Sequence, residues 1–574
     1  MKTEKPKTSF AQWRDFFLFL KKAKVPWYIV LVTFFIDALG VTLFVKLPAV
    51  LGEIMDGNIF DSVKIAQYGL LAFGETLFGI LSVVLSWVIG MMICSKSALG
   101  AWSKVLRLPM SHLDQEGHSS LTSRVTWEPA QVSEAVNCIF YWCSSLYSLI
   151  LVYVEMFKLH TGMATILLSV PVLVAISMAI VGRLGYDRQK RVADSLSLLT
   201  SYLAVRLPNA RMIKAFGMQR AEQKAGQEYM EARYHADMKV VVVNTISTAM
   251  QELTNAFVNI VVVVYGAYLV GSGRWELGEF VAFFLFAAQG MFIWYAQSLV
   301  MYYTSIKIGM GGCSKMAELI DSDEEDISEG KSFTVPEADI VFDNVSFGYG
   351  DQYVLQNVNM TIPKGKMTAI VGTNGSGKST ILKLIERLYE PDSGKITYGG
   401  EDAQKYKLND WRGSIGYVMQ NSPLLIGTIA DNISYGMEQS SNEQVADVAK
   451  LVGAYEFITK MEDGFDTPVG EMGGKLSGGQ RQKLAIARAM IRKPELYLLD
   501  EATCGLDVCS EQEITEMLNK YLRGKTSVVI AHNLETIRMA DQIVVLQDGR
   551  VACTGTHDSL MRDSELYRSF FGVK

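Results

Sequence analysis

The chain has 574 residues, of which 49% are hydrophobic and only 20% are charged. It is too long for one ordinary domain, and its charged share lies below the roughly 25% that is typical of soluble domains. The formal net charge of −6 gives no support for a nucleic-acid partner, and we expect none. The seven cysteines have neither the spacing of a zinc site nor the density of a disulfide framework.

The first 310 residues contain six apolar segments, each long enough to cross a bilayer, which takes about 20 residues. The last four contain no charged residue, and the first two contain one each, Asp37 and Glu75. Uninterrupted runs of this length argue against the alternative, which is a set of buried helices in a soluble domain. The sequence therefore predicts transmembrane helices at residues 25–44, 65–93, 135–154, 161–182, 253–273 and 280–306.

Basic residues indicate the orientation of these helices. Seven Lys or Arg residues precede residue 25 and eleven lie within residues 183–239, whereas the connections on the opposite side carry very few. The positive-inside rule then places both termini in the cytoplasm of a multi-pass protein of the cell (plasma or inner) membrane. Residues 10–20, rich in aromatics and followed by lysines, are predicted as a helix on the membrane surface. The long cytoplasmic connections predict helices that extend beyond the membrane and reverse at short turns near residues 117–124 and 207–214.

The composition changes after the sixth segment. Residues 321–330 contain six acids, which is typical of a solvated linker. From about residue 339, short apolar strands alternate with amphipathic helical stretches, as in an α/β domain. We therefore predict a helical six-span membrane domain, an acidic linker and an α/β nucleotide-binding domain, at residues 1–310, 311–335 and 336–574.

The second domain contains a sequence motif that predicts a phosphate-binding loop. A short apolar strand at residues 367–371 leads into Gly-Thr-Asn-Gly-Ser-Gly-Lys-Ser, which matches G-x-x-x-x-G-K-[ST], and a helix is predicted after it. The glycines let backbone N–H groups surround phosphate oxygens, and the helix N-terminus adds partial positive charge. Lys378 would reach the β- and γ-phosphates, and Ser379 would ligate Mg²⁺. The predicted nucleotide-binding residues are Gly372, Thr373, Asn374, Gly375, Ser376, Gly377, Lys378, Ser379 and Thr380.

A second apolar strand, residues 496–499, ends in two carboxylates, Asp500 and Glu501. By itself such a pair is typical of a solvated strand end, but the phosphate loop upstream favours a functional interpretation. Asp500 would hold Mg²⁺ through its water shell, and Glu501 would polarise the attacking water as a general base.

Between these elements, Leu-Ser-Gly-Gly-Gln precedes a helix predicted at residues 481–490 and forms a second anion site. One nucleotide has a single γ-phosphate, so the simplest explanation is that this site caps ATP bound to a second copy of the domain. The residues concerned are Ser477, Gly478, Gly479 and Gln480.

Together these motifs resemble those of ATP-binding cassette (ABC) domains, which belong to the P-loop NTPases. Six helices followed by one cassette is similar to an ABC exporter half-transporter of the multidrug, lipid or peptide class, over the whole chain. The resemblance implies ATP and Mg²⁺ as cofactors and ATP hydrolysis coupled to transport. It also implies adenine stacking by Tyr349, contact of Gln420 with Mg²⁺ and water, a dimer-crossing loop at Asp507, and a γ-phosphate switch at His532. The predicted catalytic residues are Glu501, His532, Gln420 and Lys378, and the predicted metal ligands are Ser379, Gln420 and Asp500.

A half-transporter also needs a second half. Chains of heterodimers often lose either the Asp-Glu and His set or the signature, whereas this chain keeps all of them, so a homodimer in the lipid bilayer is favoured over a heterodimer. The dimer-crossing loop departs from the usual family pattern because it carries Cys504 and Gly505.

Five membrane residues are candidates for contact with a substrate, which the sequence does not identify. A charge or an amide in a span is costly against lipid, so these side chains should face a cavity or another helix. Two glutamines of the sixth span, eight residues apart, share one side of the helix. A cavity of aromatics, amides and acids suits an amphipathic molecule, neutral or cationic, although purely structural pairing between helices remains the alternative. The candidates are Asp37, Glu75, Gln289, Trp294 and Gln297.

These observations favour ATP-driven export of an amphipathic small molecule, lipid or peptide by alternating access. Two alternatives stay open at this point. One is import on the same fold, as in some siderophore carriers, and the other is a membrane-tethered ATPase that acts as a sensor or regulator.

Overall fold

The computed structural model describes residue 14 and residues 26–56, 61–287, 291–333, 338–350, 352–421, 423–437, 439–470, 473–502, 508–531 and 533–570. The chain divides into two compact units, residues 1–108 with 113–323 and residues 109–112 with 324–574. Of the surface helix predicted at residues 10–20, only Arg14 is described, so that prediction stays open.

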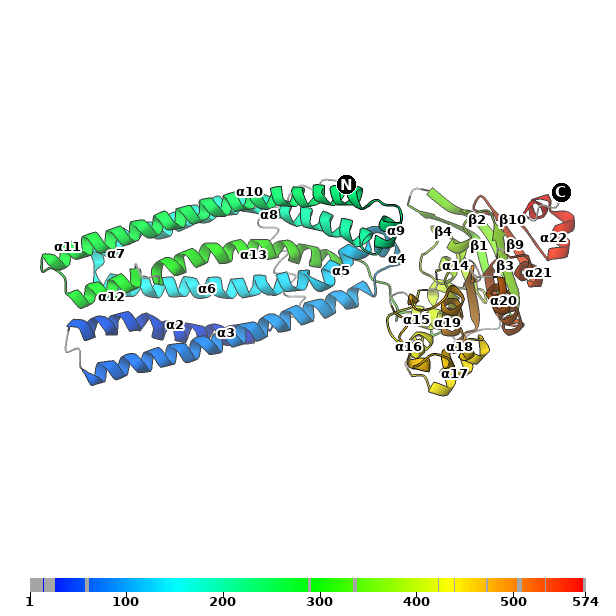
Figure 1. The fold of residues 1–574 in the computed structure, drawn as a ribbon, viewed down its shortest axis with the longest axis horizontal. Coiled ribbons are helices and arrows are strands. Elements are labelled where there is room, and N and C mark those ends of the chain that lie inside the picture. Colours follow the sequence, from blue (N-terminus) through cyan, green and yellow to red (C-terminus); the bar gives the residue numbers. More distant parts are fainter. Residues whose placement is uncertain are drawn as a thin grey trace. The chain divides into compact units, whose positions relative to one another are not determined.

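Six helical segments of the first unit are long and apolar enough to cross a membrane, as the sequence predicted. Each overlaps one predicted segment, and they run alongside one another in Figure 1. They are Trp27–Asp56, Ser62–Val105, Glu128–Leu159, Thr161–Ile180, Gln219–Gly271 and Leu277–Lys307.

Several of these spans consist of more than one element, and several extend beyond the apolar segment as predicted. The fifth span contains a short π-helix, η1, and the fourth is interrupted at Leu168. The elements are α2 (Trp27–Asp56), α3 (Ser62–Val105), α6 (Glu128–Leu159), α7 (Thr161–Leu167), α8 (Ser169–Arg206), α10 (Gln219–Ile260), η1 (Val261–Tyr265), α11 (Gly266–Gly271), α12 (Leu277–Ala287) and α13 (Met291–Asp321).

The connections at the far ends of these helices differ from the predicted short turns. They contain short helices, α4 (Met110–Glu116), α5 (His118–Thr126) and α9 (Ala210–Ala215). Gly117 joins α4 to α5 with a φ of 76°, a conformation that glycine adopts without strain. A helix of one or two turns is too short for the periodic pattern by which helices are detected, so the sequence did not distinguish it from a turn.

Two glycines and a carboxylate hold α2 against α12. A Cβ atom on Gly278 would lie 2.2 Å from the carbonyl oxygen of Gly52, so the two backbones approach too closely for larger residues. Small residues at such contacts are typical of helices in membranes. Asp56, the last residue of α2, accepts hydrogen bonds from the N–H groups of Gly278 (2.6 Å) and Glu279 (3.1 Å). Its negative charge therefore satisfies the first amides of α12.

The second unit is an α/β domain with two sheets, drawn in green to red in Figure 1. The larger sheet has the order β10-β9-β3-β8-β7-β6, with parallel neighbours except for the antiparallel pair β10 and β9. The smaller sheet, β2-β1-β4-β5, is antiparallel. Strand bounds are β1 (Ile340–Tyr349), β2 (Gln352–Ile362), β3 (Met367–Gly372), β4 (Ser393–Tyr398), β5 (Glu401–Asp402), β6 (Ile415–Val418), β7 (Leu496–Asp500), β8 (Thr526–Ile530), β9 (Gln542–Gln547) and β10 (Arg550–Gly555).

Alternate side chains of the larger sheet enter two separate cores. Ile370 of β3 packs with the smaller sheet and α14, whereas Ala369 and Val371 pack on the opposite face with α16 to α19. Burial on both faces explains why β3 and β7 are continuous apolar runs. The helices are α14 (Lys378–Ile385), η2 (Ala403–Lys405), α15 (Leu408–Gly413), α16 (Ile429–Ser434), α17 (Asn442–Leu451), α18 (Tyr455–Thr459), η3 (Gly464–Asp466), α19 (Gly478–Ile491), α20 (Val508–Leu522), α21 (Leu534–Met539), α22 (His557–Asp563) and α23 (Glu565–Ser569).

The acidic segment before the first strand is attached to this unit through Glu325. Both carboxylate oxygens of Glu325 accept hydrogen bonds from the terminal nitrogens of Arg412, at 2.7 and 2.9 Å. The Glu325 side chain is only 16% exposed, so the prediction of a solvated run is wrong at this residue. The guanidinium group of Arg412 offers two parallel N–H donors, the arrangement that a carboxylate binds best. The two residues are 87 positions apart, so the sequence did not indicate this ion pair.

Glu386, which follows the last residue of α14, lies beside the same arginine. Arg412 donates to the backbone carbonyl of Glu386 at 3.2 Å. Burial raises the pKa of the Glu386 carboxyl to about 7, and the positive charge of Arg412 opposes this rise only in part. The end of α14 therefore carries a carboxyl group that changes its charge near neutral pH.

Candidate functional site

Three segments that carry predicted site residues follow strands at one edge of the larger sheet. β3 leads into the phosphate loop, β7 ends at Asp500, and β6 ends two residues before Gln420. Because these strands are parallel, their carboxyl ends meet at the same edge, where open α/β sheets bind ligands. The fold thus brings together residues that are far apart in the chain.

The backbone of the phosphate loop requires its glycines. Gly375 and Gly377 have φ angles of 83° and 97°, in the left-handed region that favours glycine. A Cβ atom on Gly372 would lie 2.3 Å from the carbonyl oxygen of Leu546 on β9. Gly377 is the residue before α14, so the loop leads directly into a helix N-terminus, where backbone amides and the helix dipole favour an anion.

The side chains of the loop are positioned around the same point. Lys378 Nζ donates to the carbonyl oxygens of Gly372 (3.0 Å) and Thr373 (3.1 Å), which bridges the loop. Ser379 Oγ donates to Asp500 Oδ1 at 3.2 Å. Ser376 Oγ is buried and has no hydrogen-bond partner among the described residues. A phosphate in the loop would satisfy this hydroxyl group.

Glu501 and Gln420 form a pair beside Asp500. Gln420 Nε2 donates to Glu501 Oε2 at 2.8 Å. Glu501 has a φ of 50°, which is uncommon for a residue with a side chain and costly to maintain. Strained residues of this kind occur often at functional sites, where the surrounding structure holds them in place.

Burial affects both charged groups at this edge. It raises the pKa of Asp500, the charge of Glu501 adds to the rise, and the hydrogen bond from Ser379 opposes it. Burial also lowers the pKa of Lys378, against the attraction of Glu501 and Asp500. A desolvated carboxylate and a desolvated ammonium each gain from a ligand of opposite charge. The edge is therefore suited to a ligand with both a cation and anionic oxygens.

Tyr349 at the end of β1 lies near the loop with 43% of its surface exposed. Its ring packs edge-on against Tyr389, with centroids 5.2 Å apart. Lys383 Nζ donates to the Tyr349 hydroxyl at 3.3 Å and lies 5.3 Å from the ring centroid. Lys383 and Tyr389 were not among the site residues that the sequence predicted. Lys383 lies one helical turn after Ser379 on α14, and that spacing was the available signal.

The predicted signature forms the N-terminus of α19. Ser477 Oγ accepts from the N–H of Gln480 (3.2 Å), and Gln480 Oε1 accepts from the N–H of Ser477 (2.9 Å), a complete capping box. Ser477 and Gly478 are exposed, whereas Gly479 is buried. A Cβ atom on Gly479 would lie 2.9 Å from Ser510 Oγ, which explains the second glycine. His532, Asp507 and Gln289 lie outside the described residues, so their predicted roles stay predictions.

Asp37, in the first span, joins three helices. Its carboxylate accepts hydrogen bonds from the hydroxyl groups of Ser82 on α3 (2.9 Å) and Ser144 on α6. Glu75 accepts a hydrogen bond from the hydroxyl group of its neighbour Thr76, at 3.2 Å. The bonds of Asp37 agree with the structural pairing that the sequence left open.

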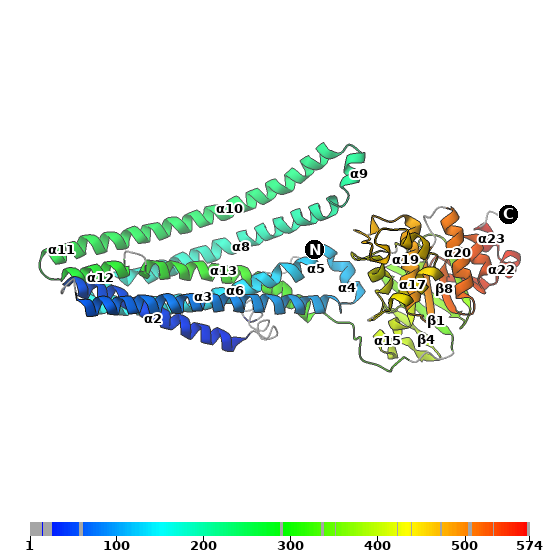
Figure 2. The same ribbon diagram turned by 60° about the horizontal axis from the view of Figure 1, so that its bottom comes forward.

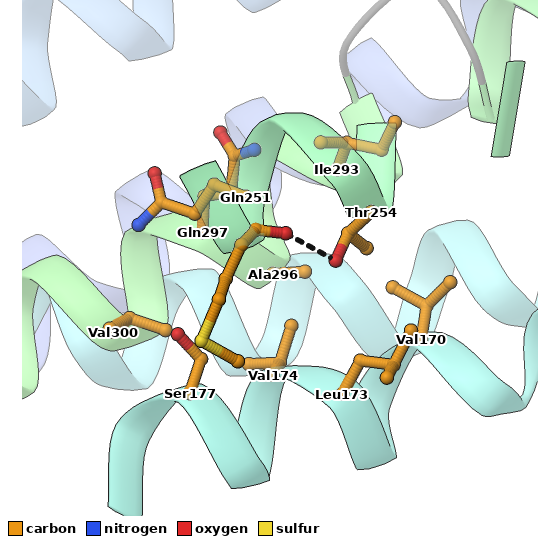
Figure 3. A pocket seen from close by; sticks show the side chains of 11 residues that line it. Val170, Leu173, Val174, Ser177, Gln251, Thr254, Ile293, Ala296, Gln297 and Val300 are labelled. Carbon is orange, nitrogen blue, oxygen red and sulfur yellow. Dashed lines mark hydrogen bonds between the residues drawn. The ribbon is translucent and has the colours of Figure 1, made fainter. Parts of the chain in front are cut away.

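Gln297 of α13 lines a pocket between α8, α10 and α13, shown in Figure 3. Gln251 and Thr254 of α10 line it as well, and the other lining residues are mostly apolar side chains of the three helices. The cavity volume is about 20 Å³, which is close to the space that one water molecule needs. Trp294 is 61% exposed and is not among the lining residues. Among the predicted substrate residues described here, the pocket therefore contains Gln297 alone.

Comparison with known proteins assigns both units. Residues 29–294 match the family model described as ABC transporter transmembrane region, and residues 355–504 match the model described as ABC transporter. A lipid A-core flippase of Escherichia coli (strain K12), described as ATP-dependent, is 32% identical over 516 residues, which cover 89% of this chain and 88% of that protein. The chain belongs to the ABC transporter family.

Two further relatives indicate the branch of the family. A multidrug resistance ABC transporter ATP-binding and permease protein of Lactococcus lactis subsp. cremoris (strain MG1363) is 27% identical over 566 residues, covering 97% of this chain and 95% of that one. A solved structure of a bacterial Atm1-family ABC exporter with ATP bound has a TM-score of 0.82 and 26% identity, covering 96% and 98% of the two chains. This ABC transporter is thus a multi-pass membrane protein of the exporter type with an ATP-binding cassette, and its family couples ATP hydrolysis to transport.

Proposed function

We propose that this ABC transporter uses ATP hydrolysis to export an amphipathic small molecule, lipid or peptide by alternating access. The observation that carries the proposal is the meeting of the phosphate loop, Asp500 with Glu501, and Gln420 at one sheet edge. The six spans of the same chain supply the membrane pathway that such an ATPase would drive.

In the proposed mechanism, the phosphates of ATP occupy the loop of residues 372–380. Lys378 exchanges its two carbonyl partners for phosphate oxygens, and Ser376 gains the partner that it lacks. The exposed ring of Tyr349 stacks on the adenine. Ser379, Asp500 and Gln420 present the oxygen ligands that Mg²⁺ prefers, and the ion would neutralise phosphate charge.

Glu501 is the proposed general base, which accepts a proton from the water that attacks the γ-phosphate. Gln420 donates to one oxygen of Glu501 and so orients the carboxylate. His532 is proposed to contact the γ-phosphate and Asp507 to cross to the second cassette. The resemblance to the family supports these two roles.

The exposed N-terminus of α19 supports a dimer, because its amides can cap a nucleotide bound to another cassette. We propose a homodimer, since this chain carries both the phosphate loop with Asp500 and Glu501 and the signature residues 477–480. The chain expressed alone should purify as a dimer with ATPase turnover. A monomer that stays inactive until a different chain is added would contradict this.

We also propose the orientation of the chain in the membrane, the membrane in which it lies and the bounds of its domains. The basic residues within 183–239 support a cytoplasmic location of the cassette and both termini, in the plasma or inner membrane. We retain the bounds 1–310, 311–335 and 336–574. The predicted substrate residues Asp37, Glu75, Gln289, Trp294 and Gln297 would give a neutral or cationic amphipathic substrate polar and aromatic contacts. The pocket at Gln297, about 20 Å³, holds no more than a water molecule, so substrate would enter a wider conformation of the alternating-access cycle.

The test is vectorial transport in sealed membrane vesicles. Inside-out vesicles, which expose the cassette, should accumulate a fluorescent amphipathic cation when ATP is added, and vesicles with Glu501→Gln should not. Accumulation only in right-side-out vesicles loaded with ATP would show import. Turnover without movement of any amphipathic probe would show an ATPase that does not transport these compounds.

A further inference from the structure

Two basic faces meet across a second cavity, between α8 and α10. Arg188, Arg191 and Ser195 line it from α8, and His235, Lys239 and two alanines line it from α10. Spacings of three, four and seven residues place each set on one face of its helix. The cavity volume is about 220 Å³, whereas about 15 Å³ is enough for a water molecule. The space therefore accommodates a chemical group much larger than water.

The charges that line this cavity have the same sign. Three of the lining side chains are permanent cations, His235 is a fourth basic group, and none of the lining residues that the structure describes is acidic. Two nearby acids on α10 have other contacts, since Asp237 pairs with Arg233 (3.3 Å) and Glu231 accepts from Gln227 (2.6 Å). Asp194 of α8, three residues after Arg191, is exposed and is not among the described lining residues. Within the described part of the chain, no ion pair compensates Arg188, Arg191 or Lys239. Arg191, His235 and Lys239 are exposed, so water screens part of their repulsion, and an anion between the two helices would lower what remains.

A hydrogen bond between α8 and α10 already fixes Arg188. Arg188 Nη1 donates to the backbone carbonyl of Lys239 at 3.3 Å, which joins α8 to α10. This bond uses one of the five N–H donors of the guanidinium group. The remaining donors, with those of Arg191, form the planar arrangement that binds phosphate oxygens in pairs.

The cavity lies beyond the end of the apolar region of both helices. On α8, the span ends at Ile180, and Arg188 follows eight residues later, about 12 Å along the helix. On α10, Lys239 precedes the span predicted at residues 253–273 by 14 residues, about 21 Å of helix. The basic residues therefore lie beyond the ends of both spans, on the side where the proposed orientation places the cytoplasm with its soluble phosphates, and the lipid phosphates of that leaflet are the nearest part of the membrane.

We propose that the cavity between α8 and α10 is a binding site for a phosphate-bearing anion, either the headgroup of an anionic lipid or a soluble phosphate. Arg188 and Arg191 grip the phosphate oxygens, Lys239 neutralises the remaining charge, and His235 donates a hydrogen bond from the opposite helix. The site is separate from the ATP edge and from the pocket at Gln297, so it does not rest on the proposed function.

The test is isothermal titration calorimetry on the full chain in detergent, with the ATP edge saturated by MgADP. The probes are dihexanoyl phosphatidic acid, inorganic phosphate and dihexanoyl phosphatidylcholine. The phosphatidic acid should bind more tightly than the phosphatidylcholine, whose choline cancels its charge. The variant Arg188→Gln/Arg191→Gln/Lys239→Gln should bind phosphatidic acid at least about tenfold more weakly, because it loses three charge-assisted contacts.

The matched control is Arg211→Gln/Arg220→Gln/Lys224→Gln, which removes the same charge from exposed positions outside the cavity and should bind like the parent. The single variants Arg191→Gln and Lys239→Gln, each weaker than the parent, serve if the triple variant does not fold. Loss of both phosphatidic acid and inorganic phosphate binding supports a soluble anion, and loss of the lipid alone supports a headgroup. No binding of either probe, or equal binding by parent and cavity variant, overturns the proposal.

Discussion

The ATP edge of the cassette and the pocket at Gln297 are both proposed ligand sites, but they are built differently. At the ATP edge, one unbroken run, residues 372–380, supplies the loop, and the other residues follow the ends of neighbouring strands. In the membrane unit, the pocket takes side chains from three helices, α8, α10 and α13, none of them adjacent in sequence. The first site depends on backbone conformation, which a short sequence motif can indicate. The second depends on how the helices pack and rotate against one another, and short motifs do not indicate that packing.

The two regions also differ in how they hold partly buried carboxyl groups. Asp37 in the membrane unit receives hydrogen bonds from two serine hydroxyls on other helices. Glu386 in the cassette has a pKa raised to about 7 by burial. Figure 2 shows the two units from a second direction, with strands β1, β4 and β8 labelled in one and the long helices α3, α8 and α10 in the other. Four predictions test whether chemistry and stability divide between the regions in this way.

The largest effect should come from Glu501→Gln. The amide keeps the shape of the side chain but cannot accept a proton, so ATPase turnover should fall at least about 100-fold while ATP binding persists. Turnover and nucleotide binding are measured separately on the purified protein. Glu495→Gln, at the opposite end of β7, is the control and should be neutral. Near-normal turnover in the Glu501 variant would show that Glu501 is not the general base.

Gly372→Ala should test the claim that backbone geometry builds the ATP edge. The added methyl group meets the Leu546 carbonyl oxygen at 2.3 Å, so the cassette should lose about 1–3 kcal/mol of stability and bind ATP more weakly. Gly69→Ala on α3 has no atom within 4 Å of its added methyl group and is the control from the membrane unit. Calorimetric unfolding with and without nucleotide measures both. Equal effects of the two substitutions would refute the contrast.

Glu386→Gln should change how stability depends on pH. Because the pKa of the folded protein, about 7, exceeds the ordinary value of 4.5, the protonated carboxyl contributes stability that is complete below about pH 4.5 and lost as pH rises through 7. The parent cassette should therefore lose about 2 kcal/mol more than the variant between pH 5 and pH 8.5. Thermal unfolding across this range provides the measurement. The exposed Glu390→Gln should follow the parent, and identical pH profiles for all three proteins would contradict the assignment.

Gln297→Ala should have the smallest effect. The concentration of an amphipathic cation that half-maximally stimulates ATPase in lipid nanodiscs should shift by about three- to tenfold, because one amide contact is lost. Basal turnover should remain. Gln67→Ala, an exposed amide on α3, is the matched control. If no hydrophobic cation or peptide alters turnover, or if the variant responds like the parent, Gln297 does not contact substrate.

Much of the fold could be predicted because the relevant signals are local. Bilayer-length apolar runs gave the six spans, and the glycine spacing of the loop reflects φ angles at Gly375 and Gly377. Contacts between distant segments carried no such signal. Nothing in the sequence pairs Glu325 with Arg412, or Lys383 with Tyr349. The helix pattern placed Gln297 on a polar side, but the choice of Gln251 as its neighbour depends on the packing of α10 against α13.

The backbone conformation of Glu501 lowers the stability of the cassette at the residue that the proposed activity requires. A φ of 50° costs a residue with a side chain about 1–3 kcal/mol, a cost that glycine at this position would avoid. A mutation of Glu501 to glycine would therefore yield a more stable cassette that has lost its proposed general base.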